Sequence, residues 1–350
     1  MDITMKLILH VGTEKTGSTY FQEFCYINRD LLMKEGILYP QTLTYKGSWH
    51  RYAPFIALRE KDLEMISMLN MRNHDKEYIK NHAAKVIEAF IEEVKYYRNI
   101  CQYCIISSEH LHSRMTEEAA KNLKHILHDI FEDITVYMHL RPQIDLITSF
   151  ASTAAMCGTV INKEWFLRFD ENTNYTNYFR LYKIYADVFG KSNVRVIPYK
   201  LIPNFTKFIF TEMGVDRQIE RNARDVGGKL NSYLDYRVIA YLNYINSTKK
   251  IKEGDILGIQ IAAQRLNNMI KKKERVNVGY KDAIIIQNRF KKVNLELVNT
   301  LESTQNSLDI RDLDPNYEKY KEKENISLVG SVDTLAELLT IVSSSQDKLL

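Results

Sequence analysis

The stretch that most constrains this chain lies close to its start, over residues 6–20. An apolar run of strand length ends at Gly12, and a segment rich in Gly, Thr and Lys then leads into a helical pattern that starts near Thr19. Glycines let the backbone approach an oxyanion closely, and the free N–H groups of a first helical turn point at such a group. We therefore expect a strand, an anion-binding turn and a helix N-terminus in succession.

The lysine of this turn does not stand where a nucleoside triphosphatase has it. Gly12 and Gly17 have the spacing of the two glycines in a P-loop, which continues with Lys and then Ser or Thr. Here Ser18 follows Gly17, and Lys15 lies inside the loop. This departure argues against a kinase that uses ATP or GTP. The simplest structural alternative is that Lys15 is a solvated loop lysine.

Composition sets wide bounds on the class of protein. The chain has 350 residues, of which 45% are hydrophobic and 26% charged, as in ordinary globular proteins. The net charge of +4 is too small to predict a nucleic-acid partner. No apolar run reaches the ~18 residues of a membrane span, and residues 1–4 cannot supply a signal peptide. With four cysteines, too few for a disulfide framework, we expect a cytoplasmic protein without a transmembrane segment.

Strand-like and helix-like runs alternate over about the first 200 residues. The expected strands are 6–12, 36–40, 101–107, 134–140 and 194–198, and the expected helices are 19–34, 76–97, 116–131, 143–156 and 175–189. Such alternation predicts an α/β fold with a parallel sheet covered on both faces.

The strand signal disappears beyond Gly214. Helices are expected there over residues 232–248, 255–274, 282–301 and 331–344, with a long charged loop over 309–325. We therefore expect residues 1–215 to form an α/β nucleotide-binding core. Residues 216–350 are expected to form a mainly helical region that completes or extends the same domain.

Polar side chains follow three of the expected strands. Ligands of a parallel sheet bind beyond the carboxyl ends of its strands, so these positions are candidates for a site. The first strand end offers loop amides and Lys15, and the second offers Glu109 and His110. The third offers Arg141 and, eight residues later, Ser149.

These motifs resemble the sulfotransferases that use 3′-phosphoadenosine 5′-phosphosulfate (PAPS). In that family a lysine inside a strand–loop–helix is followed by Gly and two hydroxyl residues, as in residues 15–19. A second strand ends in Arg, with Ser eight residues later, as Arg141 and Ser149 do. The resemblance covers about residues 5–200 and is greatest to bacterial members that act on carbohydrates. It implies a P-loop-like three-layer fold with a central parallel sheet.

The resemblance also implies a donor, an acceptor and roles for the loop. PAPS would be the co-substrate, adenosine 3′,5′-bisphosphate the product, and a hydroxyl of a sugar or glycan the acceptor. Lys15 would stabilise the leaving phosphate oxygen in a loose transition state. The residues implied to hold the 5′-phosphosulfate are Gly12, Thr13, Lys15, Thr16, Gly17, Ser18 and Thr19. Because a sulfuryl group has less charge than a terminal phosphate, we expect no metal.

Arg141 and Ser149 would bind the 3′-phosphate, which distinguishes this donor from ATP. An ordinary pair at a helix start is the structural alternative for them. Lys229, in a glycine-containing segment over residues 225–231, is a further candidate for the 3′-phosphate. This segment lacks the family's usual order of residues, and a turn before a helix explains it equally well.

The acceptor hydroxyl needs a base, and two adjacent residues are candidates for it. Glu109 falls where the carbohydrate branch of the family has a glutamate, whereas His110 corresponds to the histidine of the small-molecule branch. The resemblance favours Glu109, for which an N-cap of a short helix is the structural alternative. His50 is a candidate for substrate contact, with a surface or packing role equally open. A P-loop kinase and a non-catalytic nucleotide- or glycan-binding module remain the alternative functions.

Overall fold

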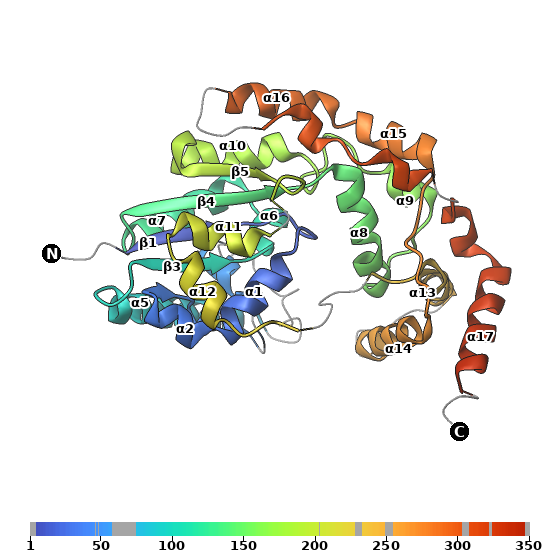
Figure 1. Cartoon of the computed structure of the whole chain (residues 1–350), viewed down its shortest axis with the longest axis horizontal. Coiled ribbons are helices and arrows are strands. Elements are labelled where there is room, and N and C mark those ends of the chain that lie inside the picture. Colours follow the sequence, from blue (N-terminus) through green and yellow to red (C-terminus); the bar gives the residue numbers. More distant parts are fainter. Residues whose placement is uncertain are drawn as a thin grey trace. The chain divides into compact units, whose positions relative to one another are not determined.

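In the computed structural model, the described part of the chain comprises residues 5–45, 47, 49–57, 75–202, 204–227, 233–248, 255–302, 308–321 and 324–346. Lys229 lies outside these residues. The chain divides into two compact units, each built from segments that are far apart in the sequence (Figure 1). The first unit spans 1–141, 177–230 and 293–312, and the second spans 142–176, 231–292 and 313–350. The assignment of residues 1–215 to a core that residues 216–350 complete or extend stays a prediction.

The first unit contains a five-stranded sheet in which every pair of neighbouring strands is parallel, with the order β2-β3-β1-β4-β5. The strands are β1 (Lys6–His10), β2 (Ile37–Leu38), β3 (Tyr103–Ser107), β4 (Asp133–Leu140) and β5 (Val194–Pro198). In the central strand, Ile8 pairs with Ile105 of β3 and Thr135 of β4. The prediction of an α/β fold with a parallel sheet is confirmed.

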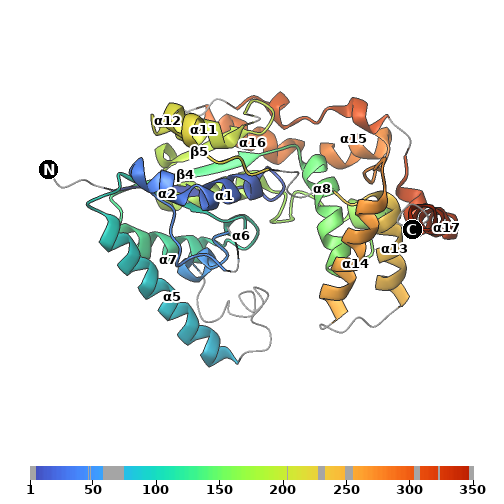
Figure 2. The ribbon, with the colours of Figure 1, turned by 60° about the horizontal axis from the view of Figure 1, so that its bottom comes forward.

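Helices cover both faces of this sheet, giving the three layers that the fold class predicts (Figures 1 and 2). One face carries α1 (Ser18–Ile27), α2 (Arg29–Lys34), α11 (Phe205–Glu212) and α12 (Asp216–Asn222). The other carries α3 (Ala53–Ala57), α5 (Lys76–Tyr97), α6 (His110–Ser113), α7 (Glu117–His128) and α10 (Tyr178–Phe189). The short η2 (Lys191–Asn193) precedes β5, and α16 (Lys291–Leu301) and η3 (Ile310–Leu313) complete the described elements.

Successive side chains of a strand point to opposite faces of the sheet, and those on the face that α1 covers form a hydrophobic core. Ile8, Ile105 and Ile197 pack with Phe21 and Phe210 in one buried cluster. Burying a side chain of this size stabilises a fold by about 1.5–3 kcal/mol. The cluster therefore fixes α1, and with it the loop that precedes this helix, against the sheet.

The expected helix over residues 19–34 is interrupted at Asn28, so that part of the prediction is wrong. The Asn28 amide nitrogen donates to the carbonyl oxygens of Phe24 and Arg224, and its side-chain oxygen accepts from the Arg224 N–H. These bonds join α1 to the segment after α12. A pattern of apolar residues cannot reveal such a break, because its partner is 196 residues away.

All the regular elements among the described residues of the second unit are helices. Its elements are α8 (Gln143–Met156), α9 (Lys163–Leu167), α13 (Tyr236–Thr248), α14 (Asp255–Met269), α15 (Tyr280–Asn288), η4 (Tyr317–Tyr320), η5 (Ile326–Gly330) and α17 (Val332–Gln346). α13 packs against α8, α14 and α17. The expected helix over 282–301 is in fact two helices, α15 and α16, and the expected loop over 309–325 contains η3 and η4.

Arg237 joins two helices of the second unit through ion pairs. Its guanidinium forms an ion pair with buried Asp235 at 2.7 Å and a second one with Glu337 at 2.7 Å. Each carboxylate favours the charged form of Arg237. The start of α13 is thereby tied to α17.

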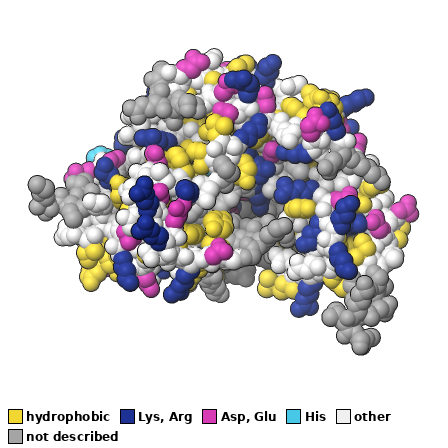
Figure 3. Space-filling model, viewed as in Figure 1, with side chains coloured by type: hydrophobic (Ala, Val, Ile, Leu, Met, Phe, Trp, Pro, Cys, Tyr) yellow, Lys and Arg dark blue, Asp and Glu magenta, His cyan; other side chains and the backbone are white. Residues whose placement is uncertain are grey.

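Among the described residues, no helix combines the length and the hydrophobicity that crossing a membrane requires. On the face seen in Figure 3, Lys and Arg side chains are interspersed with Asp and Glu side chains. This mixture is what the small net charge of +4 leads one to expect.

Candidate functional site

The loop after β1 has an unusual backbone. Lys15 has a φ of 67° and Gly17 a φ of 88°, and Lys15 is the only residue other than glycine with a positive φ in the described part of the chain. Such a conformation costs a non-glycine residue about 1–2 kcal/mol, so the surrounding contacts must hold it. Turns of this kind direct successive backbone N–H groups into a concavity that suits an anion.

Contacts from the end of β4 hold the loop in this shape. Arg141 Nη1 donates to the Lys15 carbonyl oxygen at 2.6 Å, and the Thr13 hydroxyl donates to the His139 carbonyl at 2.6 Å. Within the loop, the Thr16 hydroxyl donates to the Thr13 carbonyl at 2.6 Å. Thr13 and Thr16, which the resemblance implies as ligands of the donor, thus use their hydroxyls to shape the loop. The site lies where the connections after β1 and β4 diverge, the usual ligand position in such sheets.

A buried histidine explains why the first position of the loop is glycine. A Cβ added to Gly12 would lie 2.7 Å from His10 Nε2. His10 Nδ1 is held by the Ser107 hydroxyl at 2.8 Å, so the ring cannot move away without losing that bond. Burial, and then the neighbouring His139, lowers the pKa of His10 to about 3. The ring is therefore neutral at physiological pH and serves as packing beneath the loop.

The N-terminus of α1 has no side-chain cap. Gly17 occupies the N-cap position and makes no side-chain cap hydrogen bond, and the first turn contains no acidic residue. A Cβ at Gly17 would meet nothing within 4 Å, so space is open above the loop. An uncapped helix N-terminus beside an anion-binding turn provides N–H donors and a positive helix dipole.

Glu109 contacts this loop directly. The Ser18 hydroxyl donates to Glu109 Oε2 at 3.1 Å, and Glu109 makes no side-chain cap to α6. Glu109 thus occupies the N-cap position of α6, as the structural alternative has it, but its carboxylate does not cap the helix. Burial, and then the charge of Glu14, raises the pKa of Glu109, while Lys15 and the Ser18 bond act in the opposite direction.

His110 has a different environment from Glu109. Its Nδ1 lies 2.6 Å from Arg114 Nη1, which donates to the ring nitrogen because a guanidinium has no acceptor. Burial, followed by the charges of Arg114 and Arg51, lowers the pKa of His110 to about 3. Among the two candidate bases, Glu109 is the one with a hydrogen bond to the loop.

His50 packs inside the first unit instead of presenting a free nitrogen. Its Nε2 bonds to the Pro40 carbonyl at 3.0 Å, and its Nδ1 accepts from the Ser107 N–H at 3.1 Å. The ring is fully buried and stacks on Tyr39 with a centroid distance of 4.0 Å. The geometry supports the packing alternative, and substrate contact by this side chain would require it to give up both bonds.

The remaining predicted residues stay predictions. Ser149 lies on α8 in the second unit and is half-buried. Thr19 lies in the first turn of α1. Lys229 is outside the described residues.

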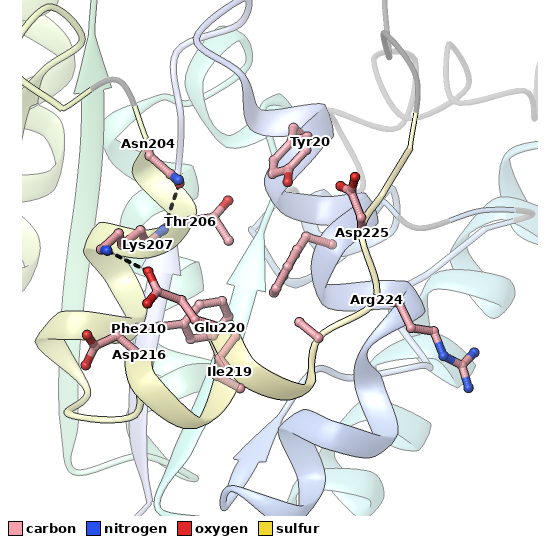
Figure 4. Close-up of a pocket in the computed structure, with 12 residues that line it drawn as sticks. Tyr20, Asn204, Thr206, Lys207, Phe210, Asp216, Ile219, Glu220, Arg224 and Asp225 are labelled. Atoms are coloured by element: carbon pink, nitrogen blue, oxygen red, sulfur yellow. Dashed lines mark hydrogen bonds and ion pairs between the residues drawn. The ribbon is translucent and has the colours of Figure 1, made fainter.

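A pocket beside α1 was not predicted from the sequence. It has a volume of about 180 Å³ (Figure 4). Its lining residues come from α1, α11, α12 and the segment after α12: Tyr20, Phe24, Asn204, Thr206, Lys207, Phe210, Asp216, Ile219, Glu220, Ala223, Arg224 and Asp225. Tyr20 directly follows the loop residue Thr19, and its ring stacks on Phe24. The spacing of Tyr20 and Phe24, which puts both rings on one face of the expected helix, is the sequence feature that could have indicated this pocket.

No cluster of three or more His, Cys, Asp or Glu side chains suited to a metal ion occurs among the described residues.

No known protein family and no curated protein matches the sequence. A solved structure, that of a sulfotransferase from Alicyclobacillus acidocaldarius, is similar to this chain with 14% identity. The similarity covers 74% of this chain and 94% of that chain, with a TM-score of 0.35.

Proposed function

We propose that the protein is a sulfotransferase that transfers a sulfuryl group from PAPS to a hydroxyl group of a sugar or glycan. The observation that carries the proposal is the convergence of three strand ends on one loop. Lys15 follows β1, Arg141 at the end of β4 holds its carbonyl, and Glu109 at the end of β3 bonds to Ser18. A lysine within the turn, a guanidinium and a half-buried carboxylate are the groups that this reaction requires.

The loop is suited to the 5′-phosphosulfate of the donor. Backbone N–H groups of the left-handed turn and of the uncapped α1 N-terminus can bind its oxygens. Lys15 has the charge to stabilise the leaving phosphate oxygen. Ser18 and Thr19 add hydroxyls in the first turn of α1.

Arg141 is suited to the 3′-phosphate, although one of its nitrogens already binds the loop. Its Nε is buried without a hydrogen-bond partner among the described residues, and its guanidinium stacks 5.3 Å from the Tyr199 ring. A buried donor that lacks a partner costs about 1–3 kcal/mol, which a bound anion would recover. We assign Ser149 to the same phosphate on the resemblance alone.

The pocket beside α1 is suited to the purine base. It has aromatic walls from Tyr20 and Phe24 and polar groups at Asn204, Thr206 and Asp225 (Figure 4). Its volume of about 180 Å³ is below the roughly 300 Å³ of a drug-sized site, which fits one ring system rather than a whole nucleotide. Tyr20 places this pocket next to the loop that takes the phosphates.

In the proposed reaction the acceptor oxygen attacks sulfur in line with the leaving group. A bond forms between that oxygen and sulfur, the bond from sulfur to the phosphate oxygen breaks, and the acceptor proton passes to Glu109. A raised pKa makes Glu109 a better proton acceptor near neutral pH. His110 is less suited because its Nδ1 lone pair is engaged by Arg114.

Thermal denaturation with nucleotides tests the proposal. A ligand that binds the native state raises the melting temperature. We expect stabilisation by adenosine 3′,5′-bisphosphate without magnesium and none by ATP with magnesium. The reverse result would favour a kinase. Binding of the bisphosphate without turnover of labelled PAPS, on a panel of glycans and small hydroxyl compounds, would favour a non-catalytic module.

A further inference from the structure

The segment over residues 41–52 lies next to the candidate base. His50 belongs to this segment, and its Nδ1 accepts from the N–H of Ser107, the last residue of β3, shortly before Glu109. α3, which follows the segment, packs against α6, which begins directly after Glu109. The residues around His50 are therefore held close to the carboxylate that is proposed to accept the proton.

Hydrogen bonds fix the backbone of this segment at several places. The Glu93 carboxylate of α5 accepts from two backbone N–H groups at its start, at 2.8 and 3.0 Å. The Tyr52 N–H donates to the Leu43 carbonyl at 3.0 Å, and the His50 ring adds a bond to the Pro40 carbonyl at 3.0 Å. Side chains on such a backbone are already in place, so a ligand that binds them pays little of the usual cost of ordering.

Aromatic side chains of this segment and of α5 form a continuous row of rings. The ring centroids of Tyr45 and Tyr52 are 5.5 Å apart, and Tyr52 contacts His82 of α5 at 5.2 Å, edge to face. His82 is in turn stacked on Tyr78, one helical turn earlier, at 6.2 Å with 1° between the ring planes. We call these residues the tyrosine row: Tyr45, Tyr52 and Tyr78, with His82 between the last two.

The tyrosine row is partly open to solvent. Tyr45 and Tyr52 are half-buried, and Tyr78 is 47% exposed. Buried Phe55 of α3 is stacked on Tyr52 at 5.2 Å and supports the row from the core. Single exposed rings are common on protein surfaces, but several that stand together mark an interaction site.

The chemistry of the tyrosine row fits a sugar chain. The face of a tyrosine ring has partial negative charge and attracts the C–H groups on one face of a pyranose, while the phenol hydroxyl bonds to sugar hydroxyls. A row of rings offers this surface to several successive sugar units. Figure 2 shows α5 on the sheet face opposite to α11 and α12, which line the pocket assigned to the purine base, so the two ligands do not compete.

We propose that the tyrosine row binds successive sugar units of the acceptor, which is therefore an oligosaccharide or a longer glycan and not a single sugar. This inference rests on the proposed function and adds to it the class of acceptor and the residues that bind it. The chain bound along the row would bring one of its units to Glu109, because the segment that contains Tyr45 and Tyr52 is joined to the end of β3.

Sugars of different length test the tyrosine row. Cellotetraose, maltotetraose and chitotetraose are each compared with the monosaccharide of which they consist, glucose or N-acetylglucosamine. Calorimetry measures their binding to the protein saturated with adenosine 3′,5′-bisphosphate. We expect at least one tetrasaccharide to bind tenfold or more tightly than its monosaccharide. Tetrasaccharides that all bind no better than their monosaccharides would overturn the proposal.

Variants then assign the binding to the row. Tyr45→Ala and Tyr78→Ala should each weaken binding of the best tetrasaccharide at least fivefold, and Tyr78→Phe, which retains the ring, should have a smaller effect. Tyr96→Ala is the matched control, because it removes a 73% exposed tyrosine near the other end of α5, and it should have no effect. Unchanged tetrasaccharide binding by both Ala variants would also overturn the proposal.

A short oligothymidylate tests the other class of ligand that stacks on aromatic rings. Binding of nucleic acid depends on neutralising phosphates, and the net charge of the chain is only +4, so we expect the oligonucleotide to bind more weakly than the best tetrasaccharide. Tighter binding of the oligonucleotide that both Ala variants lose would assign the row to nucleic acid instead.

Nucleotide binding separates this inference from the proposed function. Both Ala variants should retain wild-type affinity for adenosine 3′,5′-bisphosphate, which also shows that they are folded. If the folded variants lose it, the tyrosines serve the donor and the proposal is wrong. If wild-type protein does not bind the bisphosphate, the proposed function fails, whereas the comparison of sugar lengths, repeated without nucleotide, still tests the tyrosine row.

Discussion

The Ser18 hydroxyl donates a hydrogen bond to the Glu109 carboxylate at 3.1 Å, joining the first turn of α1 to the end of β3. This bond links the residue proposed to accept the acceptor's proton to the loop proposed to hold the donor. A donor phosphate that takes the Ser18 hydroxyl would leave Glu109 free for the acceptor. Donor binding and activation of the base are therefore coupled in the proposed mechanism.

Removing the Ser18 hydroxyl should change the pH dependence of the reaction. The bond favours ionised Glu109 and so lowers its pKa, which means that Ser18→Ala should raise it. A base must be ionised, so kcat/KM should fall on the acid side at a higher pH in the variant. The acid limb of the wild type should itself lie above the ordinary range of a glutamate pKa, because burial and the charge of Glu14 raise the pKa of Glu109.

The position of the acid limb distinguishes the two candidate bases. Ser18→Thr retains a hydroxyl and should leave the limb near its wild-type position. With His110 as base, the limb would lie near its pKa of about 3 and Ser18→Ala would not move it. Glu109→Gln with near-normal kcat would rule Glu109 out.

Lys15 should affect the chemical step more than binding. Lys15→Ala should lower kcat roughly a hundredfold or more, the scale for losing one donor to a developing charge. Lys34→Ala, at the exposed end of α2, is the control and should keep normal activity. Steady-state kinetics with labelled PAPS measure both, and near-normal turnover of Lys15→Ala would exclude the proposed role.

Arg141 contacts the loop and is proposed to contact the 3′-phosphate. The effects of these two contacts can be distinguished with two nucleotides, one with and one without a 3′-phosphate. Arg141→Ala should weaken the binding of adenosine 3′,5′-bisphosphate by about 1.5–3 kcal/mol, the range for a charged hydrogen bond. Adenosine 5′-monophosphate lacks the 3′-phosphate, so the same substitution should reduce its binding affinity much less. Equal losses in calorimetry would mean that Arg141 acts only by holding the Lys15 carbonyl.

Tyr20 should contribute to nucleotide affinity through its ring. Stacking of a base on an aromatic side chain contributes about 1–3 kcal/mol to binding. Tyr20→Ala should therefore weaken binding of the bisphosphate by that amount, and Tyr20→Phe should weaken it much less. Tyr26→Ala removes another exposed tyrosine of α1 outside the pocket and is the control. Full affinity of Tyr20→Ala would place the base elsewhere.

Gly12 should matter for stability through its contact with His10. Gly12→Ala would bring a methyl group to 2.7 Å from His10 Nε2, and overpacking of this kind costs about 1–3 kcal/mol of the free energy of unfolding. The same change in a His10→Ala background should cost clearly less, since contacting residues are not additive. Urea unfolding of the four proteins measures this coupling, and an equal cost in both backgrounds would refute the steric explanation.

Local sequence patterns predicted many of the helices and strands correctly. The boundaries of α5, α8 and β5 agree with the predicted segments, and α1 begins at the end of the glycine loop as expected. The break at Asn28 and the helix α11 were not predicted. Asn28 interrupts α1 because Arg224 supplies bonding partners, and sequence periodicity contains no information about such distant partners.

The sequence by itself determined the parallel α/β core, the glycine-containing loop around Lys15 and Gly17, and the polar residues that follow three of the strands, because these depend on local periodicity and on glycine. Only the tertiary structure decided which of those residues meet. Ser18 reaches Glu109 across 91 positions, and Arg141 reaches Lys15 across 126, because parallel pairing of β3, β1 and β4 brings their carboxyl ends to one edge. The same packing turned Thr13, Thr16 and His50 into structural supports, since their polar atoms found backbone partners that no local pattern specifies.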